Sequence, residues 1–260
     1  MTSDSPRGSS QRGESFVEAL SAYSRFHRAQ HWSGTFGEFL RTIVPGNARQ
    51  LARSSHEYLW DMLNWFGKNA SGATANGNGT GNSNGNGEGA GSKELFKREL
   101  FGIDEPLGRI VDYFKAAAAG SDVGRRLLLL LGPPSGGKST MAILLKRGLE
   151  EYSHTDEGAM YALQGSPMHE SPLNLIPASL RAEFRDTYGV EIKGELSPWA
   201  RDRLEREFEG DFLRMPVERI FLSEAARVGV GTYAPHDPTT ADLADLVGSV
   251  DLSKVAQYGD

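Results

Sequence analysis

The chain has 260 residues and a net charge of −6 at pH 7, and its content of apolar and charged residues is that of a soluble globular protein. It contains no cysteine, which excludes disulfides, thiolate metal sites and cysteine nucleophiles. The negative charge argues against broad nucleic-acid binding, and no apolar run approaches the roughly 20 residues that a membrane helix needs. We therefore expect a cytoplasmic protein with no nucleic-acid or membrane partner.

Composition divides the chain into four parts. Residues 1–14 are rich in Ser, Arg and Gly and are expected to be disordered. Residues 15–66 carry apolar side chains at spacings of three and four, which predicts a small helical module whose third helix covers residues 47–66. Residues 67–92 are rich in Gly and Asn and nearly free of apolar side chains, which predicts a flexible linker. The linker leads into a second domain that covers residues 93–260.

A short apolar segment with one glycine, Gly102 followed by Ile103, precedes a predicted helix. Because Gly102 has no Cβ, a flat ring could approach the backbone there, and Ile103 could pack against that ring. One interpretation is therefore an adenine pocket, and the other is an ordinary helix start. Both interpretations stay open on the sequence alone.

The central feature of the sequence is a run of five leucines, residues 127–131, followed by a complete phosphate-loop motif. An apolar run, a glycine-rich loop and an amphipathic segment in this order predict a buried strand, a loop that binds ATP or GTP, and a helix. Lys138 is expected to lie along the β- and γ-phosphates, and the Ser139 hydroxyl is expected to bind Mg²⁺. The predicted nucleotide-binding residues of the loop are Gly132, Pro133, Pro134, Ser135, Gly136, Gly137, Lys138, Ser139 and Thr140.

The segments after the loop alternate between strand-like and helix-like patterns. Residues 159–163 predict a second strand, and residues 176–188 and 197–209 predict amphipathic helices. Residues 217–223 and 227–233 are short and rich in β-branched side chains, which predicts a hairpin.

Two acidic residues in this part of the chain, Glu170 and Glu224, could be interpreted as catalytic. His169 and Glu170 lie in a proline-rich loop but lack the second histidine of an H-E-x-x-H metal site, so we favour a role in anchoring the loop. Glu224 follows an apolar segment, but Ser223 stands where a magnesium-binding Asp would be expected. We therefore assign no catalytic residue from the sequence.

Six segments together resemble the N-terminal AAA region of the PrkA family of bacterial serine protein kinases. They are residues 34–40, 99–102, 132–139, 166–173, 216–219 and 227–232, and the most specific reads S-P-M-H-E-S-P-L. Many relatives have a segment that resembles L-C-P-x-C. This chain has Leu196, Ser197, Pro198, Trp199 and Ala200 there, so the cysteines of a thiolate metal site are absent. Members of the family are also longer, so the resemblance implies that the linker is an insertion and that this chain is truncated at its C-terminus.

The motifs and the resemblance lead to one expected fold, an α/β P-loop NTPase domain of AAA type with a parallel sheet and flanking helices, preceded by the small helical module. The expected function is that of the ATP-binding region of a PrkA-like serine protein kinase or ATPase, with ATP and Mg²⁺. The sequence lacks the H-R-D and D-F-G motifs of ordinary protein kinases, so kinase activity is implied by the resemblance alone.

Three alternatives stay open beside this function. They are a nucleotide-gated interaction module without turnover, an AAA ATPase of the remodelling or protease type, and a small-molecule P-loop kinase. The sequence does not identify a protein substrate, and a homo-oligomer is one assembly that the resemblance allows.

Overall fold

The computed structural model describes residues 31–74, 91–97, 99–233 and 250–258, together with Gly248 and residues 17, 18, 20, 21 and 24. The N-terminal segment predicted to be disordered and most of the predicted linker, residues 75–90, lie outside the described residues. Within the described ranges, no helix combines the length and the apolar character needed to span a bilayer.

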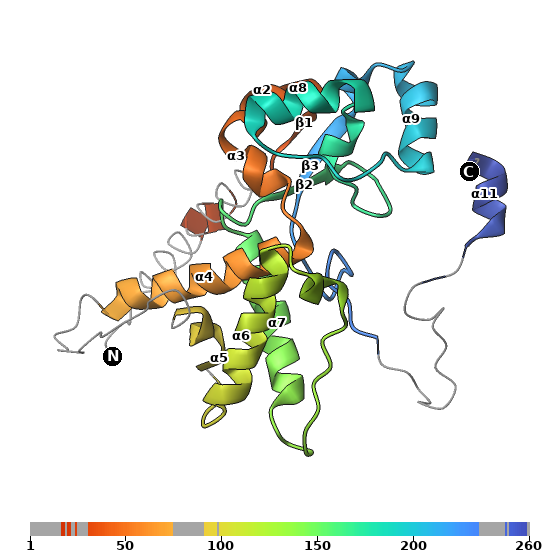
Figure 1. Ribbon diagram of the computed structural model, residues 1–260. Coiled ribbons are helices and arrows are strands. Elements are labelled where there is room, and N and C mark those ends of the chain that lie inside the picture. The colour runs from red at the N-terminus through yellow and green to blue at the C-terminus, as the bar shows by residue number, and fades with distance from the viewer. Residues whose placement is uncertain are drawn as a thin grey trace, which may run out of the picture.

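A small antiparallel sheet lies in the upper half of the molecule in Figure 1. Three strands form it in the order β1-β3-β2, and they are β1 (Ser33–Thr35), β2 (Met160–Leu163) and β3 (Pro216–Ile220). In β3, Val217 pairs with Gly34 of β1 on one side and with Leu163 of β2 on the other. Buried and half-buried residues alternate along β3, as expected for a strand with one face on a core.

The sheet and four helices build the first of two hydrophobic cores. The helices are α2 (Phe36–Thr42), α3 (Val44–Leu51), α8 (Ala178–Tyr188) and α9 (Pro198–Phe208). Phe39, Met215 and Val217 are fully buried in this core. Figure 1 shows the four helices around the sheet.

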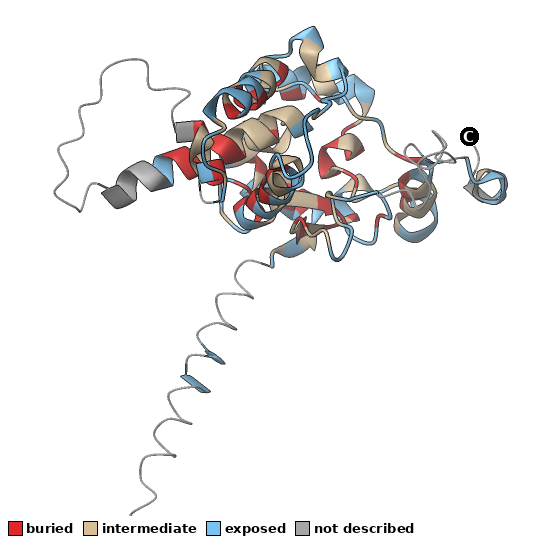
Figure 2. Cartoon of the chain, turned by 90° about the horizontal axis from the view of Figure 1, so that it is seen from below, coloured by how far each residue is buried: buried red, intermediate tan, exposed pale blue. Residues whose placement is uncertain are grey.

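The second core lies between helices in the lower half of Figure 1. These helices are α4 (Ser55–Thr74), α5 (Glu94–Lys97), α6 (Asp104–Ala118) and α7 (Lys138–Ser153). The remaining elements are the short 3₁₀ helices η1 (Gly91–Lys93), η2 (Asp122–Arg125), η3 (Pro172–Leu175) and η4 (Phe212–Arg214), and the terminal helix α11 (Leu252–Tyr258). Figure 2 shows that buried residues gather inside the compact body, whereas α11 near the C-terminus is exposed.

Local sequence signals explain where several helices begin. Before α2, the Thr35 N–H donates to Glu38 Oε2 at 2.7 Å, and the Glu38 N–H donates to Thr35 Oγ1 at 3.2 Å. Ser54 and Glu57 form the same reciprocal cap before α4. The Ser197 hydroxyl accepts a hydrogen bond from a backbone N–H in the first turn of α9. These caps satisfy N–H groups that have no partner within the helix.

The predicted single helix over residues 47–66 is wrong, because the structure contains two helices, α3 and α4, with a break at residues 52–54. The cap formed by Ser54 and Glu57 starts the second helix at this break. Helix α4 then continues to Thr74, so residues 67–74, which we assigned to the linker, are helical. Phe66 is buried in the second core, and a helix that is already packed gains further residues at little cost.

The helices before the linker pack against later parts of the chain. Helix α4 packs against α6 and α7, and the Tyr58 hydroxyl donates a 2.8 Å hydrogen bond to the Gly158 carbonyl. The Arg53 guanidinium connects the same regions, because it donates to Asp61 Oδ2 at 2.8 Å and to the Tyr152 hydroxyl at 3.1 Å. The apolar faces of these helices are buried in clusters that include later parts of the chain.

The five leucines at residues 127–131 do not form a buried strand. Leu127 is 99% exposed, Leu129 73% and Leu131 83%, whereas Leu130 packs against the second core. None of the strands in the described part of the chain pairs with this segment. A neighbouring strand therefore neither bonds to its backbone groups nor helps to bury it. The predicted parallel sheet is therefore not confirmed, and the sheet that the structure describes is antiparallel.

Candidate functional site

The phosphate-loop motif lies between the exposed leucines and α7. Within the loop, the Gly136 N–H donates to the Pro133 carbonyl at 3.3 Å, which closes a tight turn. Ser135 and Gly137 have left-handed backbones, with φ of 62° and 80°. Gly137 adopts this conformation without strain and stands directly before α7, so the motif supplies a glycine where the chain turns into the helix.

The first turn of α7 contains backbone N–H groups that come before the first α-helical hydrogen bond. Helix α7 begins at Lys138, and its first intrahelical hydrogen bond runs from the Met141 N–H to the Gly137 carbonyl at 2.9 Å. The N–H groups of Lys138, Ser139 and Thr140 therefore precede the first helical bond. Such groups and the positive end of the helix dipole favour a bound anion.

Lys138 folds back over the loop. Its ammonium group donates to the Gly132 carbonyl at 2.8 Å and to the Pro133 carbonyl at 2.6 Å. Both carbonyls belong to exposed residues, so a phosphate oxygen could replace them as the partner of the ammonium group. Ser139, the next residue along the chain, is exposed.

The structure brings the predicted adenine-pocket segment next to the phosphate loop. A methyl group on Gly137 would lie 3.0 Å from Leu100 Cδ2 and 3.5 Å from Ile103 Cδ1. Gly102 has a left-handed backbone with φ of 72°, and Ile103 is half-buried. Sequence reasoning missed Leu100, which lies even closer to the loop than Ile103 does.

Glu170 does not contribute to this loop, because its carboxylate is bonded elsewhere. It is 6% exposed and accepts hydrogen bonds from the Ser197 N–H and the Ser197 hydroxyl, both at 2.7 Å. Ser197 in turn caps α9. The contacts support the expected role in anchoring the loop, with a partner 27 residues away in sequence that the sequence pattern did not reveal.

Glu224 is also engaged away from the phosphate loop. The Lys146 ammonium donates to Glu224 Oε1 at 2.5 Å, and this hydrogen bond, followed by one from Thr232, lowers the pKa of the Glu224 carboxyl. Lys146 follows Lys138 by eight residues in α7, which is about 12 Å along the helix axis. The structure thus favours the interpretation of Glu224 as a bystander, and the predicted hairpin around it is reduced to a bridge between Ser223 and Val228.

The described residues contain no group of three or more His, Asp or Glu side chains that could hold a metal ion. A metal at the phosphate loop would therefore depend on the Ser139 hydroxyl together with oxygens of a bound nucleotide, which is the usual arrangement for Mg²⁺. The exposed Ser139 side chain in the first turn of α7 fits such a role.

Comparisons with known proteins agree with the resemblance. A family model described as the PrkA AAA domain matches residues 34–260. The "ATP-dependent protease PrkA" of Bacillus subtilis (strain 168) is 43% identical over 244 residues, which make up 94% of this chain and 36% of that protein. The "Serine/threonine kinase YeaG" of Escherichia coli (strain K12) is 31% identical over 168 residues, which make up 62% of this chain and 25% of that protein. No solved structure gives a significant match.

Proposed function

The chain belongs to the PrkA AAA domain family, and on that basis we propose that it binds Mg-ATP at residues 132–140. The observation that carries the proposal is the geometry of the loop, in which a tight turn leads into α7 and the Lys138 ammonium lies over the loop carbonyls. Calorimetric titration with Mg-ATP tests it. Saturable binding at one site is expected, and the absence of binding would contradict the proposal.

In this proposal the residues around the nucleotide have distinct roles. Lys138 exchanges its bonds to the Gly132 and Pro133 carbonyls for bonds to phosphate oxygens. The N–H groups at the start of α7 bind the same phosphates, and Ser139 holds Mg²⁺. Gly102 and Ile103 bind the adenine ring, which the position of Ile103 beside Gly137 supports.

Replacing Ser139 by Ala should remove most of the effect of Mg²⁺ on ATP affinity while leaving metal-free binding nearly unchanged. The hydroxyl is the protein oxygen that we assign to the metal, whereas the N–H groups and Lys138 bind the phosphates directly. Titrations with ATP in the presence and absence of Mg²⁺ measure the difference. An equal gain in affinity on adding Mg²⁺ to both proteins would show that Ser139 does not bind the metal.

The five leucines have the composition of a strand inside a sheet, but no strand pairs with them among the described residues. We propose that residues 127–131 form the strand before the loop in a parallel sheet of AAA type. The exposure of Leu127, Leu129 and Leu131 supports this, because a strand of this composition is normally covered on both faces. The chain spans about a third of the length of the Bacillus subtilis relative and about a quarter of that of the Escherichia coli relative.

The activity of the whole protein is a broader proposal. We propose that the chain is the ATP-binding region of a PrkA-like serine protein kinase or ATPase, acting in the cytoplasm on a protein substrate and open to assembly as a homo-oligomer. The names of the two relatives, one a protease and the other a kinase, support two different activities that ATP binding could serve, proteolysis and phosphorylation. A nucleotide-gated interaction module without turnover is the alternative for this chain alone.

This chain by itself should bind ATP but turn it over very slowly. Phosphoryl transfer needs a carboxylate near the metal or the attacking group, and Glu170 and Glu224 are both bonded elsewhere. An arginine finger, which a partner protein can supply, contributes roughly 10³- to 10⁵-fold to the rate in such enzymes. A turnover assay with radiolabelled ATP measures this, with Lys138→Ala as the control. Several turnovers per minute that disappear in Lys138→Ala would show that the chain contains a complete catalytic site.

A further inference from the structure

A cavity lies between the two cores, near the end of α7 that is away from its first turn. Its volume is about 340 Å³, which falls within the range of small-molecule sites. Its walls come from α3, α4, α7, β2, the 169–173 loop and the segment around Leu222 and Val230. Leu149 is the residue of α7 in the wall, and it lies eleven positions after Lys138, so the cavity is separate from the phosphate loop.

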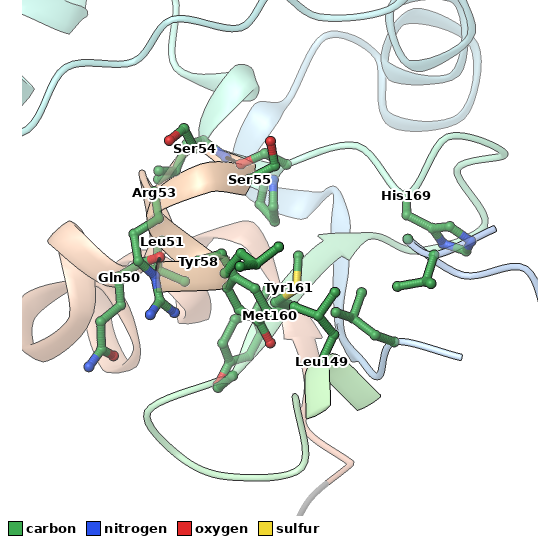
Figure 3. A pocket seen from close by; sticks show the side chains of 18 of the residues that line it. Gln50, Leu51, Arg53, Ser54, Ser55, Tyr58, Leu149, Met160, Tyr161 and His169 are labelled. Carbon is green, nitrogen blue, oxygen red and sulfur yellow. Dashed lines mark hydrogen bonds between the residues drawn. The ribbon is translucent and has the colours of Figure 1, made fainter. Parts of the chain in front are cut away.

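Most of the lining is apolar. Figure 3 shows Tyr58, Leu149, Met160 and Tyr161 in the middle of the cavity, with His169 on one side and Arg53 on the other. Burial raises the pKa of both tyrosine hydroxyls, so these groups stay neutral at physiological pH. The middle of the cavity therefore suits a ring or another compact apolar group.

The cation at one end of the cavity, Arg53, is already neutralised by Asp61. The Arg53 guanidinium forms an ion pair with Asp61 at 2.8 Å and also donates to the carbonyls of Gln50 and Glu157. The Tyr58 hydroxyl donates to the Gly158 carbonyl and is likewise satisfied. A charged ligand would lose its hydration without gaining an unpaired opposite charge, so the site favours an uncharged one.

The opposite end of the cavity carries a polar group without a described partner. The His169 backbone has a left-handed φ of 49°, and its N–H donates to the Ser166 carbonyl at 3.1 Å, which fixes the loop. Its side chain lines the cavity (Figure 3), and among the described residues the imidazole has no hydrogen-bond partner. An imidazole can donate to or accept from a hydroxyl or a carbonyl group.

We propose that this cavity binds an uncharged small molecule that has an apolar body about the size of one aromatic ring and a single hydroxyl or carbonyl group bonded to His169. The apolar walls supply most of the affinity, and the imidazole selects the orientation of the ligand. The site is independent of nucleotide binding at residues 132–140.

Three probes of one shape test the proposal on the full chain. They are p-cresol, toluene and p-toluate, which differ in carrying a hydroxyl group, no polar group and a carboxylate. Ligand-detected NMR titration should give saturable binding of p-cresol and toluene, with p-cresol about 3- to 10-fold tighter because of one neutral hydrogen bond. The p-toluate anion should bind most weakly. No saturable binding of p-cresol and toluene, or tightest binding of p-toluate, would overturn the proposal.

Two variants locate the binding. His169→Gly suits the left-handed backbone and should remove the preference for p-cresol over toluene, whereas Met168→Ala in the same loop should keep it. Ala159→Leu places extra side-chain volume in the lining and should weaken all three probes. An unchanged preference in His169→Gly, unchanged affinities in Ala159→Leu, or displacement of p-cresol by Mg-ATP would contradict the assigned site.

Discussion

Replacing Lys138 by Ala is expected to weaken the binding of Mg-ATP by about 10- to 100-fold and to leave the fold intact. A hydrogen bond to a charged group contributes about 1.5–3 kcal/mol, and the ammonium group is the cation that we assign to the phosphates. Its present partners, the Gly132 and Pro133 carbonyls, belong to exposed residues, so water can replace the lost bonds. Calorimetric titration gives the Kd of each protein.

A matched control separates this effect from a general change in charge. Arg206→Ala removes one positive charge from an exposed side chain of α9, where the Arg206 guanidinium bonds to Asp202. The Kd for Mg-ATP should be unchanged in this variant. Equal values of Kd in wild type and Lys138→Ala would mean that nucleotide binds elsewhere or not at all.

Replacing Glu170 by Ala is expected to lower the free energy of unfolding by about 2–4 kcal/mol. The substitution leaves the Ser197 N–H and hydroxyl without their partner in a buried place, and an unsatisfied buried polar group costs about 1–3 kcal/mol. The start of α9 should loosen with it, because Ser197 is the cap of that helix. Urea unfolding followed by circular dichroism measures the change.

Two further variants show whether the carboxylate acts through Ser197. Ser197→Ala should cost less than Glu170→Ala, and the double variant should cost less than the sum of the two, because both changes break one network. His169→Gly, at the neighbouring position, should change stability by less than about 1 kcal/mol, since its imidazole has no hydrogen-bond partner among the described residues. Wild-type stability in Glu170→Ala would refute the anchoring role.

The local signals in the sequence were sufficient for the helices that flank the site. The order of loop and helix predicted α7, and the segments at residues 176–188 and 197–209 match α8 and α9 to within two residues. Each of these helices carries its own start signal or its own apolar stripe. Such information is contained in neighbouring residues and can be read without knowledge of the fold.

The sheet could not be predicted in the same way, because strand pairing depends on distant segments. The pattern at residues 217–223 correctly indicated a strand, but it did not show that β3 pairs with β1 and β2 instead of with residues 227–233. The five leucines show the opposite problem. Their apolar character predicted burial, but burial requires neighbouring strands, and none pairs with them among the described residues.

The environment of the candidate site was predicted in part. The motif located the loop, and the glycine at position 102 directed attention to a segment that the structure brings beside Gly137. The bonds from Ser197 to Glu170 and from Lys146 to Glu224 were not foreseen, because they join residues that are 27 and 78 positions apart in sequence. These partners distinguish an anchoring carboxylate from a catalytic one.

The central claim is that residues 132–140 bind ATP, and amide hydrogen exchange measured by mass spectrometry tests it most directly. We predict that Mg-ATP slows exchange at residues 132–140 and in the adjoining segment at 100–103, because these backbone groups would contact the nucleotide or the residues that hold it. Exchange at residues 169–173 and 222–230 should not change. Unchanged exchange at residues 132–140 under saturating Mg-ATP, or protection confined to another part of the chain, would contradict the assignment.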